Sequence, residues 1–133
     1  MSVREILFRG KRLDNGEWVE GYYIPDGDKA YIGQSFGMQF YEVDAYTVGQ
    51  YTGLTDRNGK RIWEGDIVRY GDNIHLAVFE KRAGNAYFGI VMDEQETWGF
   101  CPSVPSNKME VIGNIHDNPE LPEKEGGAVP TRK

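Results

Sequence analysis

Short apolar runs separated by turn residues repeat along this 133-residue chain. Runs such as WVEGYYI (18–24) and IVRY (67–70) are rich in β-branched and aromatic residues, which favour strands. No stretch keeps the 3.6-residue spacing of an amphipathic helix. The pattern therefore predicts an all-β protein with little helix.

Turn sequences divide the apolar runs into hairpins. Asp14-Asn15-Gly16 and the DRNGK stretch at 56–60 both contain an Asn-Gly pair, which tolerates the positive φ of tight hairpin turns. Pro25-Asp26-Gly27-Asp28 predicts another turn, because proline presets φ at the first corner. The strands expected between the turns cover residues 5–13, 18–24, 30–32, 40–43, 45–51, 62–63, 67–70, 76–80, 87–92, 97–100 and 109–115.

Charge and cysteine content limit the chemistry available to the chain. Its net charge of -6 and pI near 4.9 make it a poor non-specific nucleic-acid binder, because phosphates repel an acidic protein. Cys101 is the only cysteine, so an intramolecular disulfide and a four-cysteine zinc site are excluded. His75 and His116 are the only histidines, too few to suggest a zinc site, and we expect no metal or cofactor.

The chain shows no targeting or membrane signal. The amino terminus lacks the apolar core of a signal peptide, and no apolar run approaches the length of a membrane span. We therefore expect a cytoplasmic protein with no membrane partner.

Three ordered motifs carry a family resemblance. The first is ILFRGK (6–11) followed by DNGEWVEG (14–21). The second is QYTGLTD (50–56) with NGK (58–60) and EGDIV (64–68), and the third is VIGNIHDNP (111–119). Together they resemble the YopX family of phage and prophage proteins over nearly the whole chain.

This resemblance implies a mostly β protein whose later half resembles an SH3-like barrel. It also implies a mobile-element origin and a bacterial host cytoplasm, and it supplies no catalytic residues. We accordingly expect one YopX-like domain over residues 1–122, with an amino-terminal β subdomain over about 1–50 and a barrel over about 51–118. The Pro-, Glu- and Gly-rich tail, residues 123–133, is expected to be flexible.

The central motif contains the candidate binding residues. Tyr51, Trp63 and Tyr70 either line a groove, as aromatics do on SH3-like binding faces, or pack in the core. The sequence leaves both interpretations open. The basic residues near these aromatics, which together with them form a candidate binding surface, are Arg57, Lys60, Arg61 and Arg69.

The neighbouring Glu64-Gly65-Asp66 corner has a structural interpretation and a catalytic one. Gly65 permits a turn, and the Asp66 carboxylate can accept backbone N–H bonds at the start of a strand. Acid–base catalysis by Glu64 and Asp66 would also need a raised pKa and a cleft. The sequence supplies neither, so we favour the structural interpretation.

Three functional hypotheses remain. The leading one is a non-enzymatic phage or prophage accessory protein that acts through protein–protein contacts and self-associates. The alternative is a nucleic-acid-associated protein that uses the basic and aromatic residues. An enzyme acting on small substrates is the third, and it has no nucleophile elbow, phosphate loop or acid–base constellation behind it.

Overall fold

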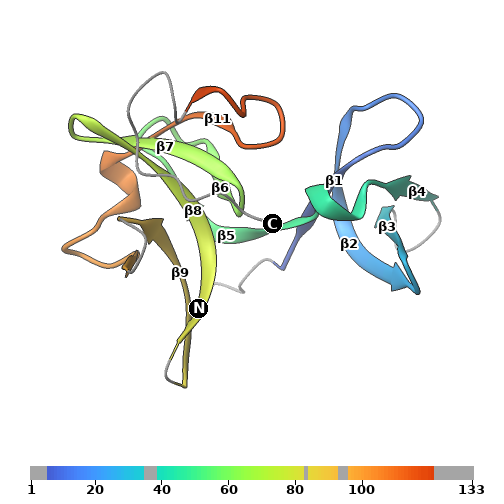
Figure 1. The fold of residues 1–133 in the computed structure, drawn as a ribbon, viewed down its shortest axis with the longest axis horizontal. Coiled ribbons are helices and arrows are strands. Elements are labelled where there is room, and N and C mark those ends of the chain that lie inside the picture. The colour runs from blue at the N-terminus through green and yellow to red at the C-terminus, as the bar shows by residue number, and fades with distance from the viewer. Residues whose placement is uncertain (1–5, 35–38, 83, 93–95, 122–133) are drawn as a thin grey trace. The chain divides into compact units, whose positions relative to one another are not determined.

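The fold is built almost entirely of antiparallel strands (Figure 1). The computed structural model describes residues 6–34, 39–82, 84–92 and 96–121. The predominance of strands confirms the predicted all-β class. The chain divides into two compact units, Met1–Gly53 and Leu54–Lys133. The tail at 123–133 lies outside the described residues, so its flexibility stays a prediction.

The amino-terminal unit is an antiparallel sheet in the order β4-β3-β2-β1-β5. Its elements are β1 (Phe8–Lys11), β2 (Trp18–Asp26), β3 (Lys29–Gln34), β4 (Gln39–Val43), the 3-10 turn η2 (Ala45–Thr47) and β5 (Gly49–Thr55), in which the division between units falls. The core of this unit forms around Ala30, Ile32 and Val43. Phe8 and Val19 pack against these three side chains.

Two local expectations for this unit need correction. The predicted turn after β2 is present at Gly27 and Asp28, but Pro25 belongs to β2 and pairs with Ala30, because an extended strand end tolerates both its φ and its missing N–H. Residues 45–47 form a 3-10 turn, because the Asp44 carboxylate accepts the Tyr46 N–H at 3.1 Å. The Thr47 hydroxyl donates to the Asp44 carbonyl at 2.6 Å, and the strand begins only afterwards.

The carboxy-terminal unit contains an open five-stranded sheet in the order β10-β9-β8-β7-β11. Its elements are β6 (Arg61–Trp63), β7 (Asp66–Tyr70), β8 (Asn73–Arg82), β9 (Asn85–Val91), β10 (Thr97–Gly99), the 3-10 turn η3 (Ser106–Lys108) and β11 (Glu110–Asn114). In the described residues β10 and β11 do not pair with each other, and β6 pairs with β5. Closure needs the two edge strands to meet, so the expected SH3-like barrel is corrected to an open sheet.

The middle of strand β8 is buried on both faces. Ala77 belongs to one core cluster, whose other buried members are Ile62, Val68, Ile90, Val104 and Met109. Its neighbours Leu76 and Val78 point to the opposite face, where they pack with Val91 and Ile115. The long β8–β9 hairpin (Figure 1) is therefore the centre of this unit.

Gly21 provides a test of the amino-terminal packing. A Cβ at this position would collide with the carbonyl oxygen of Gly33 and lie 3.2 Å from Ile32 Cγ2. Because that oxygen belongs to the backbone of a paired strand, we expect Gly21→Ala to lower the free energy of unfolding by about 2 kcal/mol or more. Chemical denaturation followed by circular dichroism measures the change.

Gly33→Ala is the matched control. A Cβ at Gly33 would meet only side-chain atoms, at 3.1 Å from Ile24 Cδ1 and 3.3 Å from the Phe40 ring. These side chains can shift, so the cost is expected to stay below about 1 kcal/mol. Equal losses in the two variants would contradict this account of the packing.

Candidate functional site

One face of the amino-terminal sheet carries large apolar side chains that are exposed. Strand register places Tyr22, Gly33 and Phe40 in one cross-strand row, and Ile24, Tyr31 and Glu42 in the next. Alternate residues of a strand share a face, so both rows lie on the same side of the sheet. Tyr22 is 52% exposed and Phe40 is 56% exposed. Two aromatic rings thus present half of their surface to solvent.

Leu13 extends this face at the β4 edge of the sheet. Its N–H donates to the carbonyl oxygen of Glu42 at 3.0 Å, which places it beside that strand, and it is 59% exposed. Gly33 leaves the centre of the face without a side chain of its own. We define the outer face as Leu13, Tyr22, Ile24, Tyr31 and Phe40, with Gly33 and Glu42 between them.

A pocket of about 330 Å³ lies at the edge of the outer face. Its lining residues are Arg12, Leu13, Asp14, Phe40, Tyr41 and Glu42. The guanidinium of Arg12 stacks on the ring of Tyr41, with its Cζ atom 4.3 Å from the ring centroid. The pocket therefore combines apolar walls with three charged groups.

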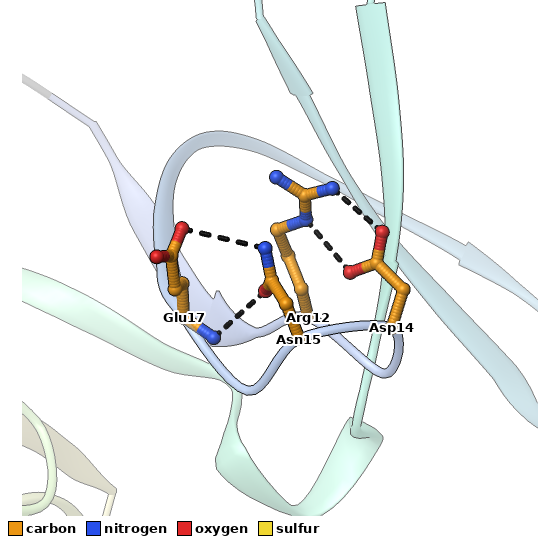
Figure 2. A network of polar contacts seen from close by, with 4 residues as sticks. All are labelled: Arg12, Asp14, Asn15 and Glu17. Carbon is orange, nitrogen blue, oxygen red and sulfur yellow. Dashed lines mark hydrogen bonds and ion pairs between the residues drawn. The ribbon is translucent and has the colours of Figure 1, made fainter.

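The β1–β2 hairpin loop holds Arg12 in position (Figure 2). Arg12 donates from Nε to one carboxylate oxygen of Asp14 at 2.9 Å and from Nη2 to the other at 2.6 Å. Glu17 donates its N–H to the Asn15 side chain at 2.9 Å, and Gly16 has a φ of 73°. The expected turn at 14–16 is confirmed. Its hydrogen bonds hold Arg12 and Asp14 at the rim of the pocket.

The Arg12–Asp14 pair determines the charge of the pocket. The side-chain hydrogen bond from Arg12 lowers the pKa of Asp14, and the same bond raises the pKa of Arg12. Both groups therefore stay ionised and neutralise each other at neutral pH. Within the described part of the chain, the Glu42 carboxylate forms no ion pair. The pocket consequently keeps one unbalanced negative charge.

The aromatic candidates from the central motif point largely inward. Tyr51 is 7% exposed in the amino-terminal unit, and Trp63 is 4% exposed in the carboxy-terminal unit. Tyr70 is half-buried and packs against the cluster that contains Val68. Tyr51 and Trp63 thus present little ring surface to a ligand.

The basic candidates all belong to the carboxy-terminal unit. Arg57 Nη2 lies 3.2 Å from Glu110 Oε1, so an acidic partner offsets its charge. Lys60 is exposed, while Arg61 and Arg69 are half-buried. The described surface around this set is therefore mixed in charge.

Asp56 organises the turn that carries Arg57 and Lys60. It is only 4% exposed, and its Oδ1 accepts the N–H groups of Asn58 and Lys60, both at 2.9 Å. Its Oδ2 accepts the N–H of Val111 at 2.9 Å and so ties the turn to β11. Burial alone would raise the pKa of Asp56, but these three backbone donors outweigh it and hold the pKa below its usual value.

Asp66 has a similar structural role at the start of β7. It is 2% exposed, and its Oδ2 accepts the Trp63 N–H at 2.8 Å. Gly65 has a φ of 93°, which lets the chain turn between Trp63 and β7. The structural interpretation of the Glu64-Gly65-Asp66 corner is confirmed.

Sequence reasoning missed the residues that line the pocket. Arg12 and Asp14 are two residues apart at the start of a hairpin turn, and their opposite charges at this spacing are a signal that the sequence contains. Phe40 and Glu42 join them only through the pairing of β4 with β3 and with Leu13. No local pattern specifies that pairing.

Replacing Asp56 tests its role in the carboxy-terminal unit. In Asp56→Asn an amide group faces backbone donors, so we expect a loss of about 1–3 kcal/mol in the free energy of unfolding near neutral pH. Because the folded pKa of Asp56 is depressed, its stabilisation is complete above its unfolded pKa of about 3.9 and is lost as pH falls through the folded value. The difference between wild type and variant should therefore shrink in acid.

Asp72→Asn is the charge-matched control in an exposed turn of the same unit. Its effect is expected to stay within about 0.5 kcal/mol. Chemical denaturation over a series of pH values provides both measurements. A constant difference between wild type and Asp56→Asn down to strongly acidic pH would contradict the assignment.

The described residues show neither a metal cluster nor a membrane span. No three of their His, Cys, Asp or Glu side chains are grouped so as to hold a metal ion. None of their helices has the length and apolar character needed to cross a membrane.

Comparisons with known proteins address the identity of the chain. No curated protein matches it. The crystal structure of protein EF1440 from Enterococcus faecalis is similar, with 25% sequence identity and a TM-score of 0.53. The match covers 90% of this chain and 99% of that one. The family model described as YopX protein matches residues 7–123, and the chain therefore belongs to the YopX family.

Proposed function

We propose that this protein is a non-enzymatic accessory protein of a phage or prophage that works through protein–protein contacts, including self-association, in the bacterial cytoplasm. The outer face carries this proposal. Leu13, Tyr22 and Phe40 are each more than half exposed on one face of a small sheet. Contiguous exposed apolar groups of this kind mark interaction surfaces in soluble proteins.

The composition of the outer face suits binding to protein. Aromatic residues are enriched where proteins bind one another, because they bury a large area at a small cost in side-chain entropy. Tyr22, Tyr31 and Phe40 supply three rings on this face. Glu42 adds a single charge among them, which can restrict the partners that fit.

Nucleic-acid binding has less support from the described surface. Stacking of bases needs exposed aromatic rings beside unopposed cations. Trp63 and Tyr51 are buried, and Arg57 pairs with Glu110. The enzymatic hypothesis likewise gains no cluster of catalytic groups from the described residues.

Self-association can be tested by sedimentation velocity over a range of protein concentrations. We expect wild type to associate, and the association to strengthen with added salt, because salt screens the repulsion between chains of net charge -6. Tyr22→Ser combined with Phe40→Ser should raise the dissociation constant about tenfold or more, because both rings lose their contacts.

Tyr46→Ser is the matched control. Tyr46 is 90% exposed but belongs to η2 and lies off the outer face, so its loss should leave association unchanged. A wild-type protein that sediments as a monomer at every concentration would refute self-association. Equal weakening by Tyr46→Ser would show that the outer face is not the contact.

A further inference from the structure

Strand β4 lies at one end of the amino-terminal sheet, so only one of its two edges is fully paired. Along the edge toward β3 it is paired over its whole length, whereas only part of the edge away from β3 is paired. On the other side, Glu42 accepts the Leu13 N–H at 3.0 Å, and Asp44 donates to the Lys11 carbonyl at 2.8 Å. Among the described residues, nothing pairs with Gln39–Tyr41 on that side.

The direction of the unpaired backbone groups follows from strand geometry. In an antiparallel sheet, every second residue turns its N–H and C=O toward the same edge. The Glu42 carbonyl faces Leu13, so the N–H and C=O of Phe40 face the same way. An extended chain laid against Phe40 would therefore find a donor and an acceptor ready for pairing.

The pocket begins where the segment Lys11–Leu13 leaves β4. Its lining residues are Arg12, Leu13 and Asp14 from the β1–β2 loop and Phe40, Tyr41 and Glu42 from β4, so the free edge and the pocket are continuous. Leu13 and Phe40 form apolar walls suited to the methylene groups of a long side chain. Glu42 provides the unbalanced negative charge. A lysine or arginine side chain matches both features.

The charge of the surrounding unit agrees with a basic ligand. Residues 1–53 carry eight acidic and five basic residues. Arg12, which lines the pocket, is engaged by Asp14 through two hydrogen bonds and by the Tyr41 ring. A second positive charge would therefore be attracted to Glu42 with little opposition from Arg12.

We propose that an extended segment of a partner protein pairs with the free edge of β4 at Phe40 and inserts a lysine or arginine side chain into the pocket beside Glu42. Main-chain hydrogen bonds supply affinity in this mode, and the pocket selects the side chain. The inference rests on the proposed function, since it names the kind of partner that the protein contacts.

The test is a titration of the ¹⁵N-labelled full chain with defined peptides. The probe is a short capped peptide of alternating threonine and valine with one central lysine, N-methylated along one edge so that it cannot pair with itself. The protein is kept at a concentration at which it sediments as a monomer, so self-association does not contribute. The backbone amide signals of Phe40 and Glu42 are followed.

Saturable shifts of these two amides are expected. The lysine peptide should bind about two- to fivefold more tightly than its norleucine analogue, as for an exposed ion pair, and the glutamate analogue should bind more weakly than both. The lysine preference should shrink with salt. A peptide that is N-methylated at every residue should not bind, because it offers no N–H to the edge.

Glu42→Gln should remove the preference for lysine over norleucine and leave norleucine binding intact. Asp28→Asn, an equal charge change in the exposed β2–β3 turn, should keep the preference. Absence of shifts at Phe40 and Glu42, or equal binding of the lysine and glutamate peptides, would overturn the proposal. So would protection of these amides from exchange on self-association without any response to peptide, since a second copy would then occupy the edge.

The two proposals fail separately. A strictly monomeric protein that binds the lysine peptide would remove self-association and keep the edge as a docking site. A self-associating protein that binds none of the peptides would keep self-association and remove the edge as a docking site.

Discussion

Two backbone hydrogen bonds, between Leu13 and Glu42 and between Lys11 and Asp44, determine the surface of the amino-terminal unit. They hold the hairpin loop against the end of β4, and this contact lets Arg12 reach both Tyr41 and Asp14. Gly10 permits the approach, because a Cβ there would lie only 2.8 Å from Val43 Cγ2. The same two bonds engage only the end of β4. They therefore position the loop residues that line the pocket and also leave the edge at Phe40 unpaired among the described residues.

Carboxylates organise the backbone in both units. Asp56 and Asp66 are buried and accept backbone N–H groups, while Asp44 fixes the turn before β5. Buried carboxylates are tolerated when several donors satisfy them, and Asp56 has three. These acidic residues contribute to local structure, whereas Glu42 lies at the candidate docking site.

Local chemistry made the turns predictable from sequence. Asn15-Gly16 and Asn58-Gly59 specify tight turns through the positive φ of their glycines, and the structure has both. Closure of the sheet was not predictable in the same way, because it depends on which distant edges meet. The YopX resemblance correctly gave the family and the all-β class, while the barrel that it implied is an open sheet.

The candidate site shows the same limit. The aromatic residues at 51 and 63 stood out in the sequence, but β5 and β6 each bury consecutive residues, so an apolar–polar alternation does not show which rings are covered. Phe40 and Glu42 became candidates only once the register placed them beside Leu13 and Tyr31. Surface sites assembled across strands need the pairing before they can be recognised.

The burial of β8 has a consequence for how the carboxy-terminal unit opens. Its two edges pair with β7 and β9, and its side chains take part in both core clusters. An amide near Ala77 can therefore meet solvent only when both clusters come apart together. Exchange at this strand would report cooperative opening of the unit, while the edge strand β10, whose Trp98 is 45% exposed, can fray independently.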